Sequence, residues 1–114
     1  MIQVDPLRRG RDAYASRAWA DAYEALASAD RTEPLEADDL ERLAICALLT
    51  GRDADHLAAL ERAHHLHAQR HDPARAARCA FWLGLRLMLR GETGPAGGWL
   101  ARAQRLVEAA ADEC

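Results

Sequence analysis

Five histidines lie within one stretch of the chain, and imidazole nitrogens are common ligands of zinc and nickel. The five are His56, His64, His65, His67 and His71. On a helix, His64, His67 and His71 stand at positions i, i+3 and i+7 and share a face, which makes them metal candidates. Leu60 and Ala63 lie close to the same face, and no cysteine or carboxylate cluster nearby in sequence completes a tetrahedral set. We therefore favour packing over metal binding and predict no cofactor.

A second candidate site is a row of arginines around a tryptophan. At 100° per residue, one helical sector holds Arg75, Arg78, Trp82, Arg86 and Arg90. Such a face can bind an anionic peptide, a nucleotide or single-stranded nucleic acid through charge and stacking. The net charge of −3, however, argues against a general nucleic-acid binder, which usually needs a basic excess. A protein partner is the favoured interpretation.

Motifs for catalysis are absent from the sequence. It contains no Gly-x-Ser-x-Gly and no His-Glu-x-x-His, and the glycine-rich "GETGPAGG" has neither a lysine nor a preceding strand. The acidic residues Asp38, Asp39 and Glu41 open a helix, where negative charge suits the helix dipole. We predict that the chain is not an enzyme.

The composition predicts an all-α protein, because alanine, leucine, arginine and glutamate dominate its 114 residues. Cys46, Cys79 and Cys114 are odd in number and form no C-x-x-C pair, as is usual in a reducing cytoplasm. The start has no apolar run for a signal peptide, and no segment has membrane-spanning length. We expect a cytoplasmic protein without a membrane partner.

Local signals divide the chain into six helical segments. Asp5-Pro6 and Asp72-Pro73 each supply a cap followed by proline at the first helical position, and Gly51 and Gly91 end helices. The expected segments are about 6–17, 19–30, 37–50, 53–70, 73–90 and 95–111. Their short links predict that successive helices are antiparallel neighbours.

The segments repeat in pairs. Gly10, Ala44 and Gly84 align with one another, as do Leu26, Leu60 and Leu100, and Ala29, Ala63 and Ala103. The units start near residues 3, 37 and 77, so the first offset is 34 residues and the second is 40, with the extra residues in "HAQRHD". In this frame we expect Gly84 to mark the closest approach of two helices, where a larger side chain would hold them apart.

This pattern resembles the tetratricopeptide repeat, a helix–turn–helix unit of 34 residues with small residues at fixed positions. The resemblance implies a single domain over 1–114, a right-handed α-solenoid of three repeats at about 3–36, 37–70 and 77–110. "GRDAYASRAWADAYEALASAD" and "RCAFWLGLRLMLRGE" are also similar to the helical-repeat regions of actinobacterial LuxR-type transcriptional regulators. In those proteins a DNA-binding helix-turn-helix usually follows the repeats.

In tetratricopeptide arrays the first helix of each repeat lines a concave groove, and the resemblance assigns groove positions here. They are Leu7, Arg11 and Tyr14 in repeat one, Glu41, Ile45 and Leu48 in repeat two, and Arg78, Phe81, Leu85 and Met88 in repeat three, with Trp82 beside them. Several are large and apolar, which suits an extended peptide or an amphipathic helix.

The last helix carries an apolar stripe that includes Trp99, Leu100, Leu106 and Val107. Solenoids need a polar-faced terminal cap, and no capping helix follows. We expect either that the chain belongs to a longer protein or that it self-associates as a homo-oligomer through this end.

Taken together, the sequence predicts a protein–protein interaction module, regulatory and associated with transcription, that binds a protein or peptide or self-associates. The alternative is a small-molecule or metal-responsive sensor, and a third hypothesis is an anion or nucleic-acid binder.

Overall fold

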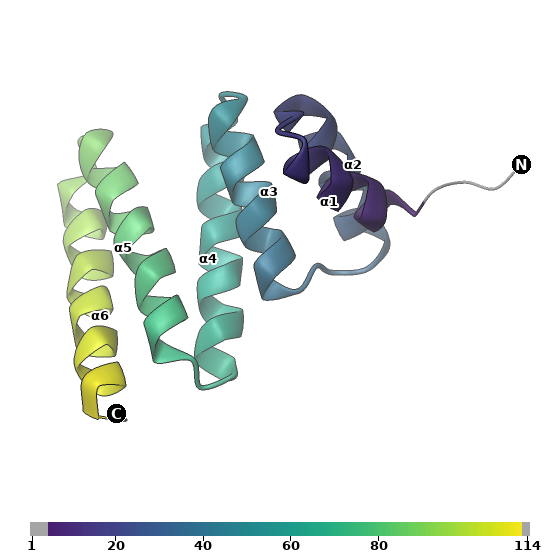
Figure 1. Ribbon diagram of the computed structural model, residues 1–114. Coiled ribbons are helices and arrows are strands. Elements are labelled where there is room, and N and C mark those ends of the chain that lie inside the picture. Colours follow the sequence, from purple (N-terminus) through teal and green to yellow (C-terminus); the bar gives the residue numbers. More distant parts are fainter. Residues whose placement is uncertain (1–4, 113–114) are drawn as a thin grey trace, which may run out of the picture. The chain divides into compact units, whose positions relative to one another are not determined.

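A computed structural model describes residues 5–112, and their regular secondary structure is entirely helical (Figure 1). The six helices are α1 Pro6–Ala15, α2 Trp19–Thr32, α3 Ala37–Leu49, α4 Asp53–Gln69, α5 Pro73–Leu89 and α6 Thr93–Asp112. The all-α prediction is confirmed over the described part of the chain. Residue 3, where the first repeat is expected to begin, lies outside it.

The expected start signals work as anticipated at α1 and α5. The carboxylate of Asp5 accepts a hydrogen bond from the backbone N–H of Leu7 at 3.2 Å, and Asp72 accepts one from Arg75 at 3.2 Å. Proline follows each cap. Helix α6 begins at Thr93, two residues before the expected Pro95. Proline is tolerated there because the first backbone N–H groups of a helix have no intrahelical acceptor.

Four of the turns between helices have the same geometry: three lie within the helix pairs, and the fourth lies between α4 and α5, where His71 has a φ of 57° and Asp72 donates its N–H to His67 O at 2.9 Å. The turn residues Arg17, Gly51 and Gly91 all have positive φ, at 60°, 77° and 83°. In each turn the next residue donates its N–H five positions back: Ala18 to Ala13 O at 2.9 Å, Arg52 to Ala47 O at 2.7 Å, and Glu92 to Leu87 O at 2.9 Å. These equivalent positions fall at the offsets found in the sequence. Each of the three pairs of helices is therefore joined by the same hydrogen-bonded turn.

Glycine marks the closest helix approach in the first and last of these pairs. A Cβ atom placed on Gly84 would lie 2.7 Å from Cγ of Leu100, and one placed on Gly10 would lie 2.7 Å from Cγ of Leu26. Both distances are too short for a real contact. In the middle pair Ala44 takes the place of the glycine, and its carbonyl oxygen lies 2.8 Å from Nδ1 of the buried His56.

The chain divides into two compact units, Met1–Ala59 and Leu60–Cys114, and the division falls within α4. In the first unit α3 packs against α2 and α1. Its core consists mainly of alanine, leucine and cysteine side chains: Ala22, Ala25, Leu26, Leu40, Ala44, Cys46 and Ala47. Burial raises the pKa of the Cys46 thiol to about 11, so it stays protonated at neutral pH.

In the second unit α5 packs against α6, and small residues again dominate the contact. The buried positions of these two helices are Ala76, Ala77, Cys79, Ala80, Leu83, Gly84, Ala96 and Ala103. Small side chains let the helix axes approach closely, and this leaves the larger apolar residues of α5 on its outer side. Within residues 5–112, none of the helices is both long and hydrophobic enough to cross a bilayer.

Candidate partner-binding surface

Helix α5 exposes large apolar side chains although its opposite face is fully packed. Phe81, Trp82 and Met88 are 46 %, 47 % and 45 % exposed, while Leu83 and Gly84 are buried. Phe81 and Trp82 stack edge to face with ring centroids 5.4 Å apart. Leu85 is half-buried between them and Met88 in sequence. These exposed apolar side chains make α5 the candidate surface for contact with another protein segment.

The arginine sector borders this apolar surface. Arg75, Arg78 and Arg90 are exposed and Arg86 is half-buried. At the two ends of the sector, Arg75 Nε lies 3.5 Å from a carboxylate oxygen of Asp72, and Arg90 Nε lies 3.2 Å from one of Glu92. These ion pairs offset part of the positive charge that phosphate binding would require.

The groove residues expected in the first unit differ in their exposure to solvent. Ile45 on α3 is 39 % exposed, and the adjacent Leu49 is 53 % exposed. Leu48 and Glu41 are half-buried. Tyr14 packs edge-on against Trp19, with ring centroids 5.4 Å apart. Of the groove residues predicted on α3, Ile45 is the exposed one, and Leu49, which was not predicted, is more exposed.

Arg11 is expected from the sequence to line the groove, but its guanidinium is engaged by a buried carboxylate. It donates two hydrogen bonds to Asp39, at 3.0 Å from Nε and 2.6 Å from Nη2. Arg42 donates a third at 2.8 Å. The Asp39 side chain is only 2 % exposed, and the hydrogen bond from Arg11 is the main reason that its pKa is lowered. Arg11 and Asp39 thus fix α3 to α1.

Sequence reasoning misses this role of Asp39, because it attributes the acidic residue to the helix dipole alone. Its partner Arg11 lies 28 residues earlier. The sequence does place Arg11 in a helix that is expected to pack beside α3. The ion pair between Arg11 and Asp39, however, depends on how the two helices pack, which the sequence pattern does not give.

The histidines are more buried than edge positions would be. His64 is fully buried and His67 is 3 % exposed. Nδ1 of His64 lies 2.9 Å from the carbonyl oxygen of Ala76, so this nitrogen must carry the proton and donate. The ring also meets Trp99 edge-on, with centroids 5.2 Å apart. His64 therefore connects α4 with α5 and α6 inside the second unit, as the packing interpretation requires.

His71 does not share a helical face with the other two. Helix α4 ends at Gln69, and His71 adopts a positive φ of 57° in the turn that follows. The expected i, i+3, i+7 arrangement is therefore wrong at its last position, because His71 lies beyond the end of the helix.

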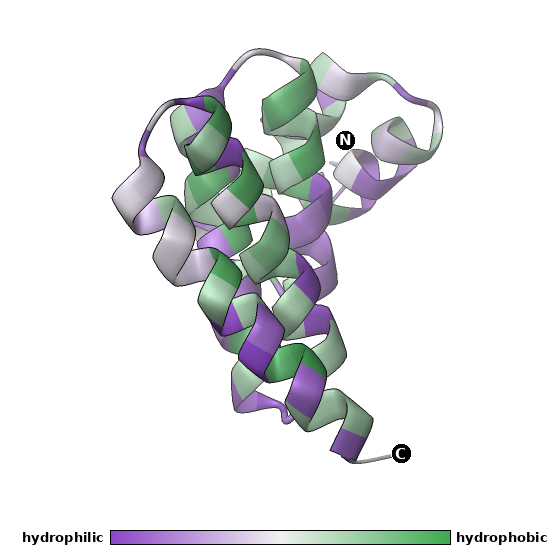
Figure 2. Cartoon of the chain, turned by 90° about the vertical axis from the view of Figure 1, so that its left-hand side faces the viewer, coloured by the Kyte–Doolittle hydropathy of each residue, from purple (hydrophilic) through white to green (hydrophobic). Residues whose placement is uncertain are grey.

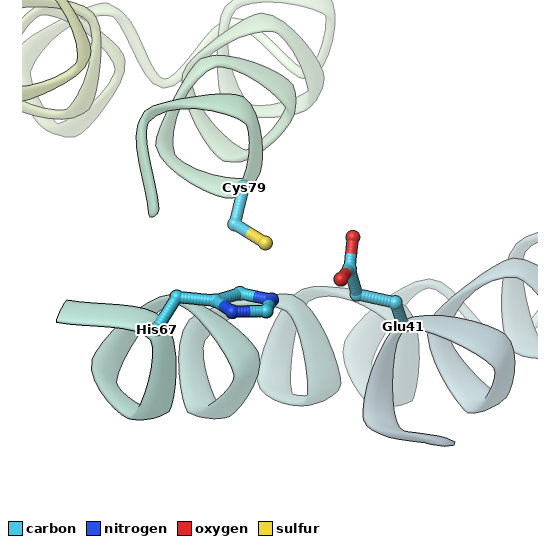
Figure 3. Close-up of side chains that lie close together, drawn as sticks. All are labelled: Glu41, His67 and Cys79. Atoms are coloured by element: carbon cyan, nitrogen blue, oxygen red, sulfur yellow. The ribbon is translucent and has the colours of Figure 1, made fainter. Parts of the chain in front are cut away.

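His67 and Cys79 form a further pair of potential metal ligands. The sequence pattern does not reveal this pair. Their donor atoms lie within 4.8 Å of one another on α4 and α5, and both side chains are buried (Figure 3). The sequence carries no signal for this pair, because the nearness of the two side chains depends on how α4 packs against α5. A structural zinc site takes four ligands, so these two donors alone do not define a metal centre.

The residues of the expected self-association end separate into different environments. Trp99 packs against His64, and Leu100 packs against Gly84. Leu106 is half-buried, and Val107 is 57 % exposed. Leu100 and Val107 also line a groove between α5 and α6.

Comparison with models of known protein families, with curated proteins and with solved structures finds no match for this chain. The candidate surface must accordingly be interpreted from its own geometry.

Proposed function

We propose that this chain is a regulatory protein–protein interaction module built from three tetratricopeptide-like helical hairpins. It binds a peptide or amphipathic helix of a partner protein through the first helices of its hairpins, in the cytoplasm, and carries no catalytic activity of its own. The observation that carries the proposal is the exposure of Phe81, Trp82 and Met88 on a helix whose other face is completely packed.

The recurring turn and the recurring glycine support the repeat assignment. Arg17, Gly51 and Gly91 occupy one position of the frame and share one turn conformation. Gly10 and Gly84 occupy another and meet a leucine at the same distance. The glycine contact thus recurs at the offset that was derived from the sequence alone, whereas the turn, which His71 also adopts between α4 and α5, supports only the short connections between helices.

The arginine sector supports the choice of a protein partner over nucleic acid. Asp72 and Glu92 lie against its two terminal arginines, and the whole chain is acidic. An apolar strip flanked by partly neutralised arginines fits a helix with a leucine-rich face and acidic edges.

Capture from a lysate of the native host tests the proposal. The immobilised chain is compared with Phe81→Ala and Leu85→Ala, and Arg105→Ala serves as the control, since Arg105 is exposed on α6 and outside the predicted groove. Quantitative mass spectrometry should show partners that both groove variants lose and the control retains, with helix content unchanged by circular dichroism. Parallel loss of helix content and capture would mean that Phe81 and Leu85 serve only the fold.

A further inference from the structure

A buried pair of donor atoms, one sulfur and one imidazole nitrogen, lies in the hairpin formed by α4 and α5. His67 is 3 % exposed and Cys79 is 1 % exposed, and their donor atoms lie within 4.8 Å of one another. Figure 3 shows the sulfur of Cys79 directed toward the imidazole ring of His67. Both residues belong to the second compact unit, so the pair is defined within one part of the chain.

The spacing of these two donor atoms suits a single metal ion between them. Bonds from a metal ion to thiolate sulfur and to imidazole nitrogen are about 2.3 Å and about 2.0 Å long. An ion bound in line by one donor of each kind therefore holds the two donors roughly 4 Å apart. The observed limit of 4.8 Å is compatible with this arrangement.

The number and softness of the donors select the kind of ion. Zinc takes four ligands in structural sites, and hard ions such as Mg²⁺ and Ca²⁺ prefer oxygen. Cu(I) prefers soft ligands such as thiolate, and it is stable with two ligands in line. The third helix of the unit, α6, adds no soft donor. Figure 2 shows hydrophobic and hydrophilic residues mixed along this helix, which runs to the C label, and its residues Thr93–Asp112 include no histidine, cysteine or methionine.

Burial of the pair favours a monovalent ion over a divalent one. On binding, the S–H bond of Cys79 breaks, the sulfur bonds to Cu(I), and the proton passes to water, with no change in oxidation state. His67 contributes the lone pair of a neutral imidazole. The charges of thiolate and Cu(I) cancel, whereas a divalent ion would leave a net positive charge buried, which is costly.

We propose that His67 and Cys79 form a two-coordinate Cu(I) site in the α4–α5 hairpin. The thiolate of Cys79 and one imidazole nitrogen of His67 are its ligands. The site lies near the turn between the helices, because α4 ends at Gln69 and α5 begins at Pro73, and local opening at these helix ends admits the ion. This inference does not depend on the proposed partner-binding role.

Transfer of Cu(I) from a coloured chelator tests the site. The full chain carrying Cys114→Ser is added, without oxygen, to the Cu(I) complex of bicinchoninate, and loss of the absorbance of that complex measures uptake. The substitution removes the terminal thiol, so that uptake reports the two internal cysteines. We expect one Cu(I) per chain, together with a thiolate-to-copper absorption band in the ultraviolet.

Substitutions in this chain assign the ligands. Cys79→Ala should abolish uptake. His67→Gln should weaken it at least about tenfold, since losing even a residue that only orients a ligand costs roughly 10- to 100-fold in metal affinity. Cys46→Ala is the matched control, because Cys46 is equally buried but lies in the first unit, and it should leave uptake unchanged. Circular dichroism checks that each variant is folded.

X-ray absorption by the copper-loaded Cys114→Ser chain identifies the ligands even where a variant does not fold. The inference predicts one sulfur and one nitrogen neighbour of copper. Absence of uptake would overturn it, as would uptake that survives Cys79→Ala or that His67→Gln does not weaken. A copper shell other than one sulfur and one nitrogen would also overturn it, and two sulfur neighbours would mean that cysteines of two chains share the ion.

Discussion

At the scale of single residues, Gly84 and Gly10 hold the hairpins at close distance. A Cβ on Gly84 would lie 2.7 Å from Leu100 and 3.2 Å from the carbonyl oxygen of Ala96. We predict that Gly84→Ala lowers the free energy of unfolding by roughly 1–3 kcal/mol through overpacking, although alanine favours helices. Urea denaturation followed by circular dichroism measures this change.

The matched control is Gly97→Ala. Gly97 lies inside α6, and no atom of a neighbouring residue lies within 4 Å of the position that a Cβ would take there. The helix propensity of alanine should therefore raise stability by roughly 0.5–1 kcal/mol. An increase in stability for both variants would show that the α5–α6 distance is not set by Gly84.

The buried imidazole of His64 predicts a pH dependence. Burial is the main cause of its lowered pKa, with Arg102 and His65 acting in the same direction while Glu61 and the Ala76 carbonyl oppose it. Because the folded state then binds fewer protons than the unfolded state, stability should fall as pH drops below about 6.5, the ordinary histidine pKa. Urea unfolding at pH 7.5 and pH 5.5 should show this loss.

Two variants test whether His64 causes the loss. His64→Gln should flatten the dependence, whereas His65→Gln, at an exposed position on the same helix, should preserve it. An unchanged slope in His64→Gln would assign the acid sensitivity to other groups.

At the scale of elements, the three equivalent turns differ in one residue. Arg17 adopts the left-handed conformation that Gly51 and Gly91 adopt in the other two. A non-glycine residue there costs about 1–2 kcal/mol, so Arg17→Gly should stabilise the chain by up to about 1 kcal/mol once the entropy of the unfolded glycine is subtracted. Thermal unfolding is the measurement.

Gly91→Ala is the reciprocal substitution and should destabilise by about 1 kcal/mol or more, because alanine would have to adopt the same positive φ. A lower melting temperature for Arg17→Gly would contradict this prediction. It would mean that the arginine side chain stabilises the fold by more than its backbone strain destabilises it.

Helix boundaries could be predicted from sequence because their causes are local. The caps Asp5 and Asp72 act through hydrogen bonds to N–H groups two and three residues ahead. Gly51 and Gly91 end helices through their own backbone freedom. The glycine contacts were also predictable, since the repeat frame brings Gly84 near the following helix without any side-chain detail.

Site details were less predictable because they depend on tertiary partners. A carboxylate in the first turn of a helix suits the dipole wherever it points, so Asp39 gave no sign of its burial. The nearness of His67 and Cys79 required the register of the α4–α5 hairpin. Likewise, local propensity could not show that the guanidinium of Arg11 would be engaged by the carboxylate of Asp39.

At the scale of the whole molecule, alanine and glycine at the helix contacts determine what remains available for binding. Small buried residues pack the hairpins and leave Phe81, Trp82 and Met88 nearly half exposed. The function we propose follows from that distribution. The largest side chains of α5 are only partly buried in the fold, and their exposed parts form a surface that a partner can cover.

Photo-crosslinking in cells of the native host tests that central claim most directly. A benzophenone amino acid replaces Met88 on the exposed surface of α5 or, as a control, the exposed Ala101 of α6. The account predicts a discrete product of higher mass from position 88, containing a second protein, and none from position 101. Only uncrosslinked chain from position 88, or the same products from both positions, would contradict it.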